Sequence, residues 1–527
     1  MPPPTPTSLA DDFFARAELQ PERPAILGPR PGERLGYREL ADQVRELAAA
    51  LATVGVRPGL NIGLHYPSGP AYIAYTYAIW TCGACVTPLP TELTGAEKRQ
   101  ILRHIAIDGI VSGARGQAEL LAPEGHAGAD RPGALLPHEA TYLTDTRRRE
   151  PPPGLAALHP AFIRFTSGTT GSAKGVVLSH RSIRERIQAA NAAIGLGPQD
   201  RVVWLLSMAY HFAVSIVAYL SHGAAIVLPA NAFGVGILKA ATEHRATLIY
   251  GSPTHYELLT HDTSGLGLPP LRLAMVTTAR LRPELAERFR NRFDLALNET
   301  YGIIELGLPA INHDRPHERQ GSVGRVLPAY QLKLVAATDG DGDRHPGTVG
   351  TEVPPGAPGE VLLRGPGMLD AYYDPWQPRA AVLAARGGWL ATGDLGRLDA
   401  DGYLTLVGRA KDLISVGGMK LFPQEVEAVL EQVPGVAEAC VYGVPDALQG
   451  ELPQVDLVAA PDATSPSAAR LDAHCRGVLA PYKVPVVFRQ VAALPRTASG
   501  KLLRRGERPP ALPEADHPPA TARKPPL

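Results

Sequence analysis

Cysteine is scarce in this sequence, with four residues in a chain of 527. That number is too small for a disulfide framework and fits a reducing compartment, so we expect a cytoplasmic protein. Two of the four, Cys82 and Cys85, form a Cys-x-x-Cys pair inside the apolar stretch 79–86. Because no second Cys pair and no His stand nearby in the sequence, we interpret both as structural residues and not as a metal or redox site.

An excess of one charge and a long apolar segment are lacking as well. The 52 basic and 52 acidic residues balance, which gives no electrostatic reason to expect nucleic acid or an anionic membrane as a partner. The longest segment without Asp, Glu, Lys or Arg, 202–238, contains His211, Gly223 and Pro229, so we predict strand, helix and strand there and no membrane span. Residues 1–6 lack the basic and apolar regions of a signal peptide.

The chain has enough apolar material for more than one core. It is 45% hydrophobic, and single cores stop growing at about 250–300 residues, so two or more domains are expected. Short apolar runs alternate with amphipathic patterns, which is typical of βαβ units and largely parallel sheets. We predict strands at 202–206, 225–228, 247–250 and 271–276, helices at 212–219 and 283–293, and a polar insertion at 339–344.

One loop carries the first chemical signal. The apolar run 162–165 leads into hydroxyl and glycine residues and then a lysine: Thr166, Ser167, Gly168, Thr169, Thr170, Gly171, Ser172, Ala173 and Lys174. Glycines let backbone N–H groups approach phosphate oxygens, hydroxyls add donors, and the lysine adds positive charge. The loop is not a Walker A loop, because Ala173 precedes Lys174 and Gly175 follows it. On these residues alone, a phosphate site and an ordinary strand-to-helix loop both stay open.

The segment 166–175 resembles the signature loop of the adenylate-forming superfamily, which includes acyl- and aryl-CoA ligases, peptide-synthetase adenylation domains and luciferases. Four further segments resemble that family's motifs in the same order: Tyr301-Gly302-Ile303-Ile304-Glu305, Thr392-Gly393-Asp394, Gly408-Arg409-Ala410-Lys411-Asp412 and Pro495-Arg496-Thr497-Ala498-Ser499-Gly500-Lys501. The resemblance implies an α/β fold, with a large N-terminal domain of α/β subdomains with mostly parallel sheets and a small, mobile C-terminal α+β domain. We expect a flexible N-terminus at 1–20, an AMP-binding domain at 21–410, the small domain with the catalytic lysine at 411–505, and a disordered Pro-rich tail at 506–527.

The resemblance also implies roles for the residues that match its motifs. The expected catalytic residues are Lys501, Glu305, Lys174 and His211. The expected ATP and AMP contacts are Thr166, Ser167, Gly168, Thr169, Thr170, Gly171, Lys174, Thr300, Tyr301, Gly302, Asp394, Arg409 and Lys501, with Glu305 and Thr166 as Mg²⁺ ligands. Lys411 is the expected hinge, and Gly417 and Gly418 are expected to line a thiol tunnel. A plain glycine turn before a helix at 423–433 explains these two glycines equally well.

The expected acid pocket is formed by His211, Phe212, Ser215, Thr277, Thr278, Ala279, Ile303 and Ile304. For His211, a capping role in the core is an equal alternative. Ala213 stands where amino-acid-activating relatives have Asp, which disfavours an α-amino acid substrate. Thr277 and Thr278 replace common glycines, so the pocket should be short or narrow and suit aryl or short-chain carboxylates better than long fatty acids. Two residues depart from the family pattern: Ile304 replaces its usual Thr and Ala173 its usual Pro.

The implied reaction is ATP-dependent activation of a small organic acid through an acyl-AMP, with release of pyrophosphate and with Mg²⁺ as cofactor. The leading hypothesis is an aryl- or short-chain acyl-CoA ligase with CoA as co-substrate. A second hypothesis keeps the adenylation but passes the acid to a separate carrier protein, an amine or another nucleophile, and includes an unconventional acid. A third, suggested by Ile304 and Ala173, is a non-catalytic adenylate-binding protein. We expect a monomer or homodimer.

Overall fold

The computed structural model describes residues 8–30, 32–113, 134–144, 149–165, 174–336, 349–416, 419–446, 448–461, 463, 465–496 and 502–504. These residues divide into two compact units, Met1–Gln331 with Arg364–Leu390 and Leu332–Leu363 with Ala391–Leu527. The chain therefore passes from one unit to the other three times. The single boundary predicted at residue 410 falls inside the second unit and stays a prediction.

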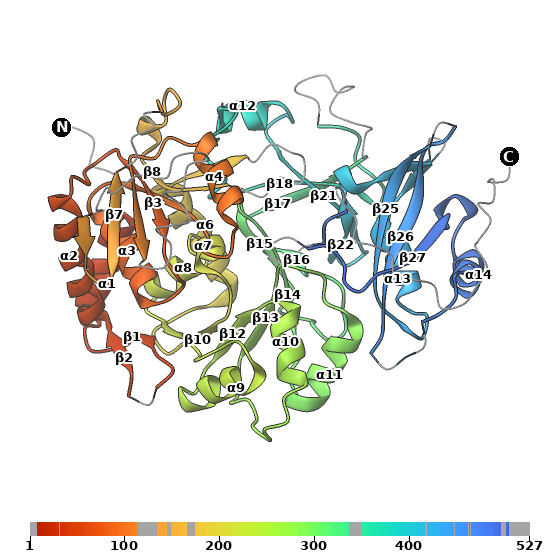
Figure 1. Ribbon diagram of the computed structural model, residues 1–527, viewed down its shortest axis with the longest axis horizontal. Helices are drawn as coiled ribbons and strands as arrows, with labels where there is room; N and C mark the ends of the chain where they lie inside the picture. The colour runs from red at the N-terminus through yellow and green to blue at the C-terminus, as the bar shows by residue number, and fades with distance from the viewer. Residues whose placement is uncertain are drawn as a thin grey trace, which may run out of the picture. The chain divides into compact units, whose positions relative to one another are not determined.

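The first unit contains a largely parallel sheet. Its strands are β1 (Pro24–Leu27), β2 (Arg34–Gly36), β10 (Arg201–Trp204), β11 (Ala225–Val227), β12 (Leu248–Gly251), β13 (Leu273–Val276), β14 (Asn298–Ile303), β15 (Gly307–Ile311) and β16 (Arg325–Val326). Among the described residues their order is β16-β15-β14-β13-β12-β10-β11-β1-β2, and the path from β14 to β1 is parallel throughout. Helices α9 (Gly234–Glu243), α10 (Pro253–Thr260) and α11 (Pro283–Phe293) pack on it through one shared apolar cluster (Figure 1).

A second sheet of the same unit has parallel strands at its centre and antiparallel strands at both edges. Its described strands are β3 (Asn61–His65), β4 (Cys85–Pro88), β5 (Gly109–Gly113), β6 (Ala134–Leu136), β7 (Ala140–Thr144), β8 (Pro160–Phe165), β9 (Gly175–Ser179), β19 (Ala371–Tyr372) and β20 (Gln377–Pro378). Their order is β20-β19-β9-β8-β4-β3-β5-β7-β6. The helices are α1 (Leu9–Leu19), α2 (Tyr37–Thr53), α3 (Pro70–Thr81), α4 (Gly95–His104), α6 (His180–Ile194), α7 (Met208–His211), α8 (Ile216–Ser221) and α12 (Arg379–Ala384), with a 3₁₀ turn η1 (Ala156–Leu158).

The flexible N-terminus predicted at 1–20 is wrong for the part that the structure describes. Ser8 caps α1 by accepting a hydrogen bond from the Ala10 N–H, and Asp11 completes a capping box. The side chains of Leu9 and Phe13 are buried, and the Phe13 ring lies 4.6 Å from that of Tyr77 in α3. Helices α1, α2 and α3 thus pack side by side, as Figure 1 shows.

The single buried helix predicted at 212–219 is also wrong, because the chain turns between α7 and α8. The Val214 and Ser215 N–H groups both donate to the His211 carbonyl, at 3.2 and 3.0 Å. Ser215 then starts α8 from a distorted backbone, with φ of −119° and ψ of −64°. The other predicted elements appear with small shifts at their ends, and α11 has the predicted bounds.

The structural interpretation of the cysteines fits their surroundings. Cys82 caps α3 and its thiol donates to the Ala48 carbonyl at 3.4 Å, while Cys85 is buried in β4. Burial raises the pKa of both thiols, to about 11 for Cys82, so neither is poised as a thiolate. Across the described residues, no cluster of His, Cys, Asp and Glu could hold a metal ion by itself.

The second unit has two sheets of its own. One contains β17 (Gln331–Val335), β18 (Gly359–Arg364), β21 (Leu390–Leu398) and β22 (Leu404–Arg409). The other contains β23 (Ile414–Val416), β24 (Met419–Leu421), β25 (Val436–Asp446), β26 (Gly450–Ala459) and β27 (Val487–Gln490), in the order β24-β23-β26-β25 with β27 beside β26. Helices α13 (Pro423–Leu430) and α14 (Ala468–Val478) and the 3₁₀ turns η3 (Ala410–Asp412) and η4 (Pro481–Lys483) complete it.

The predicted fold class is therefore confirmed: the protein is α/β, with large N-terminal sheets and a small C-terminal α+β region. The predicted insertion at 339–344 and the tail at 506–527 lie outside the described residues. No helix in the described ranges combines the length and apolar character that crossing a bilayer requires.

Candidate active site

The predicted phosphate loop connects two antiparallel strands, β8 and β9. Phe165 pairs with Gly175, so the chain continues into a strand and not into the helix that the alternative interpretation assumed. A side chain at Gly175 would place its Cβ 2.9 Å from both the Phe165 ring and the Tyr373 Cβ, so only glycine fits there. The loop residues Thr166, Ser167, Gly168, Thr169, Thr170 and Gly171 lie outside the described part of the chain.

Three side chains meet where this hairpin ends. The Lys174 Nζ lies 5.0 Å from the centroid of the Tyr372 ring, and the Tyr372 hydroxyl donates to Glu305 Oε1 at 3.3 Å. Tyr372 is held in place because β19 pairs with β9, with Tyr372 opposite Val176. Burial, followed by the charge of Glu305, raises the pKa of Tyr372, so the hydroxyl keeps its proton and stays a donor. Two predicted catalytic residues are thus joined by a tyrosine that the sequence analysis missed.

A single half-buried carboxylate suits a metal ion that arrives with its substrate. Mg²⁺ in ATP sites usually takes one or two carboxylates and completes its shell with phosphate oxygens and water. Glu305 is half-buried, and Tyr372 contacts both the Glu305 carboxylate and Lys174, so Glu305 fits that role. Thr166, the other predicted ligand, is not among the described residues.

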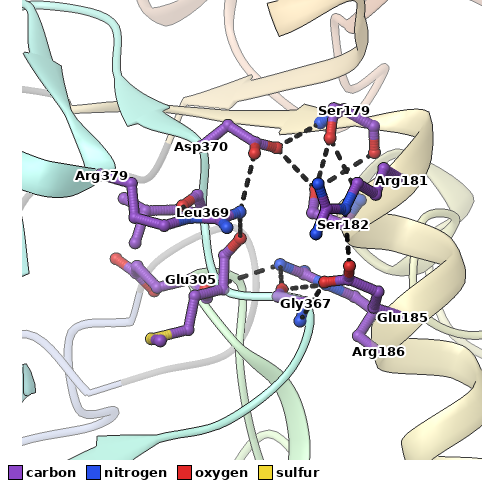
Figure 2. Close-up of polar contacts among 11 residues, drawn as sticks. Ser179, Arg181, Ser182, Glu185, Arg186, Glu305, Gly367, Leu369, Asp370 and Arg379 are labelled. Carbon is purple, nitrogen blue, oxygen red and sulfur yellow. Dashed lines mark hydrogen bonds and ion pairs between the residues drawn. The ribbon is translucent and has the colours of Figure 1, made fainter. Parts of the chain in front are cut away.

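The main chain around Glu305 is fixed by a second group that sequence analysis did not find. Leu369 donates its N–H to the Glu305 carbonyl at 2.6 Å (Figure 2). The buried Arg186 of α6 donates to the Ile304 carbonyl at 2.8 Å. The one local signal for Arg186 is a charged residue on the apolar side of an amphipathic helix, between Ile183 and Ile187.

The predicted acid-pocket residues lie near the carboxyl ends of parallel strands, where open α/β sheets bind their ligands. Trp204 ends β10 opposite Tyr250 of β12, and the His211 ring lies 6.1 and 6.3 Å from these two rings. Burial raises the pKa of Tyr250, while hydrogen bonding to the Thr277 and Thr300 side chains opposes the shift. Trp204 and Tyr250 were not predicted, and their only signal is an aromatic residue near the end of a predicted strand.

Thr278 has a backbone conformation that favours glycine. Its φ is +74°, which is strained for a β-branched residue and costs about 1–3 kcal/mol. Beside it, Thr277 is buried and Ala279 is exposed. The two threonines thus occupy space that glycines would leave open.

The remaining pocket residues differ in their surroundings. Ile304 and Ser215 are buried, and Ile303 is half-buried. Phe212 packs among the rings of Tyr72, Tyr77 and Trp80, at centroid distances of 5.7–6.1 Å. This packing gives Phe212 a role in the core, and its place in the acid pocket is only a prediction.

The predicted adenine-binding residues lie on β14. Thr300 donates its hydroxyl to the Val276 carbonyl at 2.9 Å, Gly302 is exposed, and Tyr301 is buried opposite Ala310 of β15. Tyr301 is only 5% exposed, so little of its ring is open for stacking on adenine in this conformation. The contact stays a prediction.

In the second unit, the two predicted ribose contacts are paired. Asp394 of β21 lies opposite Arg409 of β22, and Arg409 Nε stands 3.1 Å from Asp394 Oδ1. The main-chain N–H of Asp394 donates to the Thr392 hydroxyl at 3.1 Å, so the backbone of Asp394 is held as well as its carboxylate. Lys411, the predicted hinge, lies in the 3₁₀ turn that follows β22. Gly417, Gly418 and Lys501 fall outside the described ranges.

Comparison with known proteins agrees with this arrangement. Residues 13–373 match the family model described as AMP-binding enzyme, and residues 425–501 match the AMP-binding enzyme C-terminal domain. A sulfoacetate–CoA ligase from Cupriavidus necator is 33% identical, covering 94% of this chain and 96% of that protein. A feruloyl-CoA synthase from Amycolatopsis is 32% identical, covering 93% and 96%.

A solved structure agrees with the fold over the same length. The o-succinylbenzoate coenzyme A synthetase of Bacillus subtilis in complex with AMP has a TM-score of 0.77 and 25% identity, covering 95% of this chain and 99% of that one. The chain belongs to the AMP-binding enzyme family and is an adenylate-forming enzyme of the acyl- and aryl-CoA ligase type.

Proposed function

We propose that the protein activates a small carboxylic acid as its acyl-AMP, with release of pyrophosphate, and transfers the acyl group to the thiol of CoA. The cluster of Lys174, Tyr372 and Glu305 at the end of the predicted phosphate loop is the observation that carries the adenylation. Membership of an enzyme family gives no support to the hypothesis of a non-catalytic binding protein.

In the first half-reaction an oxygen of the acid attacks the α-phosphorus, and the bond to pyrophosphate breaks. Negative charge grows on the phosphoryl oxygens, so the protein contributes most through cations and donors that are already in place. Lys174 would bind the departing phosphates, with its ammonium held near them by the Tyr372 ring. Mg²⁺, when bound at Glu305, would supply further charge neutralisation. Lys501, a family expectation, would bridge the attacking carboxylate and the nucleotide.

The transfer to CoA rests on the second unit. By resemblance, rotation about Lys411 would withdraw Lys501 and bring Gly417 and Gly418 to the thiol. The pair of Asp394 and Arg409 would hold the ribose, because a carboxylate accepts two hydroxyl donors well. A separate carrier protein, an amine or another nucleophile would take the same acyl-AMP by the same first step.

The acid is small or aromatic. Thr277 and Thr278 narrow the wall where glycines are common, and Trp204 and Tyr250 place two buried rings next to His211. We therefore expect acids with a long alkyl chain to be poor substrates. One relative is named for sulfoacetate and another for feruloyl-CoA, which are compatible with a short-chain and an aryl acid respectively.

The test is a pyrophosphate-release assay with ATP, Mg²⁺ and a panel of aryl, short aliphatic, amino and inorganic acids, with and without CoA. Release with one organic acid, accelerated by CoA and accompanied by a thioester in mass spectrometry, is the expected result. If pyrophosphate is released at the same rate with and without CoA, the acceptor of the acyl group is not CoA. If only an inorganic acid supports pyrophosphate release, the substrate is not a carboxylic acid. Ile304, which stands where the family usually has Thr, would then be the first residue to examine.

A further inference from the structure

Arg186 is a fully buried arginine, only 1% exposed, that forms no ion pair with a carboxylate in the described structure. It lies on α6, which starts at the Ser179 cap directly after β9. Burial lowers the pKa of Arg186 to about 10, so the side chain still carries its charge at neutral pH. A buried charge is costly unless it is hydrogen-bonded, and its partners here are main-chain carbonyls.

The carbonyls come from two segments that are far apart in the sequence (Figure 2). Nη1 donates to Ile304 at 2.8 Å and Nη2 reaches Glu305 at 3.5 Å, on the turn after β14. Nε and Nη2 donate to Gly367 at 2.9 and 2.5 Å. The two segments also bind each other, because the Leu369 N–H donates to the Glu305 carbonyl at 2.6 Å.

The segment around Gly367 is shaped for this contact. Gly367 has a φ of +68°, and a Cβ there would lie 2.5 Å from the Arg186 Cβ. Its N–H donates to Glu185 Oε2 at 3.1 Å. Asp370 Oδ2 accepts from the Ser179 N–H and the Ser182 hydroxyl, both at 2.6 Å, and Asp370 Oδ1 pairs with Arg379 at 2.7 Å. The start of α6 therefore holds residues 367–370 at several points.

Held in this way, the segment 367–372 contacts Glu305 both at its main-chain carbonyl and at its side-chain carboxylate. Leu369 binds the Glu305 carbonyl, and Tyr372, three residues later, binds the Glu305 carboxylate. A lysine could not replace the arginine, since a single ammonium cannot reach carbonyls on two segments as a planar fork of five N–H donors can.

We propose that Arg186 is a positioning residue that fixes the Glu305 carboxylate in the orientation in which it receives Mg²⁺·ATP. The inference rests on the proposed adenylation and names a residue that acts through Glu305 without touching the substrate. A misplacement of about 1 Å at a reacting centre costs on the order of 10²-fold in rate.

The test compares Arg186→Met and Arg186→Lys with Arg292→Met. Arg292, at the end of α11, also binds main-chain carbonyls, those of Thr260 and Asp262, but it does not contact the Glu305 turn. Each variant is assayed for acid-dependent pyrophosphate release over a Mg²⁺ series. Amide hydrogen exchange of 298–306 and 365–373 and the melting temperature are followed in parallel.

For both Arg186 variants we expect a loss of about 10²-fold in rate, a higher Mg²⁺ requirement, and faster exchange in both segments together. Arg292→Met should show the same dependence of rate on Mg²⁺ concentration as the wild type. A lower melting temperature with an unchanged Mg²⁺ series would reduce Arg186 to a structural residue and overturn the proposal. If Arg186→Met does not fold, the same comparison of Mg²⁺ requirement and melting temperature is made with Arg186→Lys, which keeps the charge and most of the side-chain stem.

Failure of the proposed function gives a different pattern. Wild-type protein would then release no pyrophosphate with any acid. Hydrogen exchange with Mg²⁺ and a non-hydrolysable ATP analogue would still decide the role of Arg186. Joint protection of 298–306 and 365–373 that is lost in Arg186→Lys supports the positioning role, and protection that persists in the variant contradicts it.

Discussion

The Tyr372 hydroxyl is the only hydrogen-bond donor that the described residues show on the Glu305 carboxylate, and its ring faces Lys174. Tyr372→Phe keeps the ring and removes the donor, so we expect acid-dependent pyrophosphate release to fall about tenfold, which corresponds to about 1.4 kcal/mol. Tyr373→Phe is the matched control, because its hydroxyl accepts from the Ala106 N–H at 2.9 Å. That control should change the melting temperature more than the rate, and equal rate losses in both variants would contradict the role given to Tyr372.

Thr278 gives a second prediction at the scale of the residue. Thr278→Gly should relieve its left-handed backbone and raise the stability by about 1 kcal/mol, because glycine adopts a φ of +74° without strain. It should also widen the acid pocket, so that longer acids support pyrophosphate release. Asp294→Gly, at a φ of +50° in the cap of α11, relieves the same kind of strain away from the pocket. A broader acid range in both variants would show that flexibility, and not pocket width, was changed.

At the scale of the element, α1 is tied to α6 by a histidine that must stay neutral. The Leu9 N–H donates to His180 Nδ1 at 3.2 Å. Burial, and next the charge of Arg184, lowers the pKa of His180 from 6.5 to about 4. Because the unfolded chain takes up the proton first, this contribution to stability is complete above about pH 6.5 and is lost as the pH falls towards 4.

We therefore expect the melting temperature to fall, and the amides of 8–20 to exchange faster, between about pH 7 and about pH 5. His180→Gln supplies an uncharged acceptor for the Leu9 N–H and should make this dependence flatter. His261→Gln, on an exposed histidine near Glu257, should leave it as in the wild type. A parallel pH dependence in all three proteins would refute the assignment to His180.

Elements with a local pattern could be predicted from the sequence. The helix Pro283–Phe293 and the four predicted strands, now β10, β11, β12 and β13, stand out as apolar patterns in the sequence, and all of them are found. The signal for α1 was also present, since Ser8 and Asp11 match a capping box and Leu9, Phe13 and Ala17 recur every fourth residue. Strand β19 has only two residues, which is too short for any periodicity, so its pairing with β9 could not be predicted.

The candidate site likewise contains some residues that could be predicted from the sequence and others that could not. Lys174, Glu305, Asp394 and Arg409 stand in motifs that can be read from neighbouring residues. Tyr372 and Arg186 act on partners 67 and 181 residues away in the sequence, for which no spacing rule exists. The pairing of Asp394 with Arg409 follows from strand register, which is fixed only when β21 and β22 form a sheet.

At the scale of the whole molecule, the family expectation assigns adenylation and thiol transfer to different positions of the C-terminal domain. Lys501→Ala should therefore lower acid-dependent pyrophosphate release by about 10²–10³-fold while leaving ATP binding intact. The same variant should still form the thioester from a supplied acyl-AMP and CoA. Lys483→Ala removes another lysine of the second unit, one that pairs with Glu425 at 2.7 Å, and should keep both steps. Loss of both steps in Lys501→Ala would contradict separate roles.

The interruption of the first unit by residues Leu332–Leu363 has a consequence for the order of events at the ribosome. Glu305 leaves the exit tunnel well before Gly367, Leu369 and Tyr372, which bind it in the finished protein. The nascent chain can form the parallel sheet early, yet the Glu305 carboxylate lacks its partners until the segment Arg364–Leu390 has been synthesised. A translational stop before Arg364 would yield a product that carries the predicted phosphate loop but lacks the residues that contact Glu305.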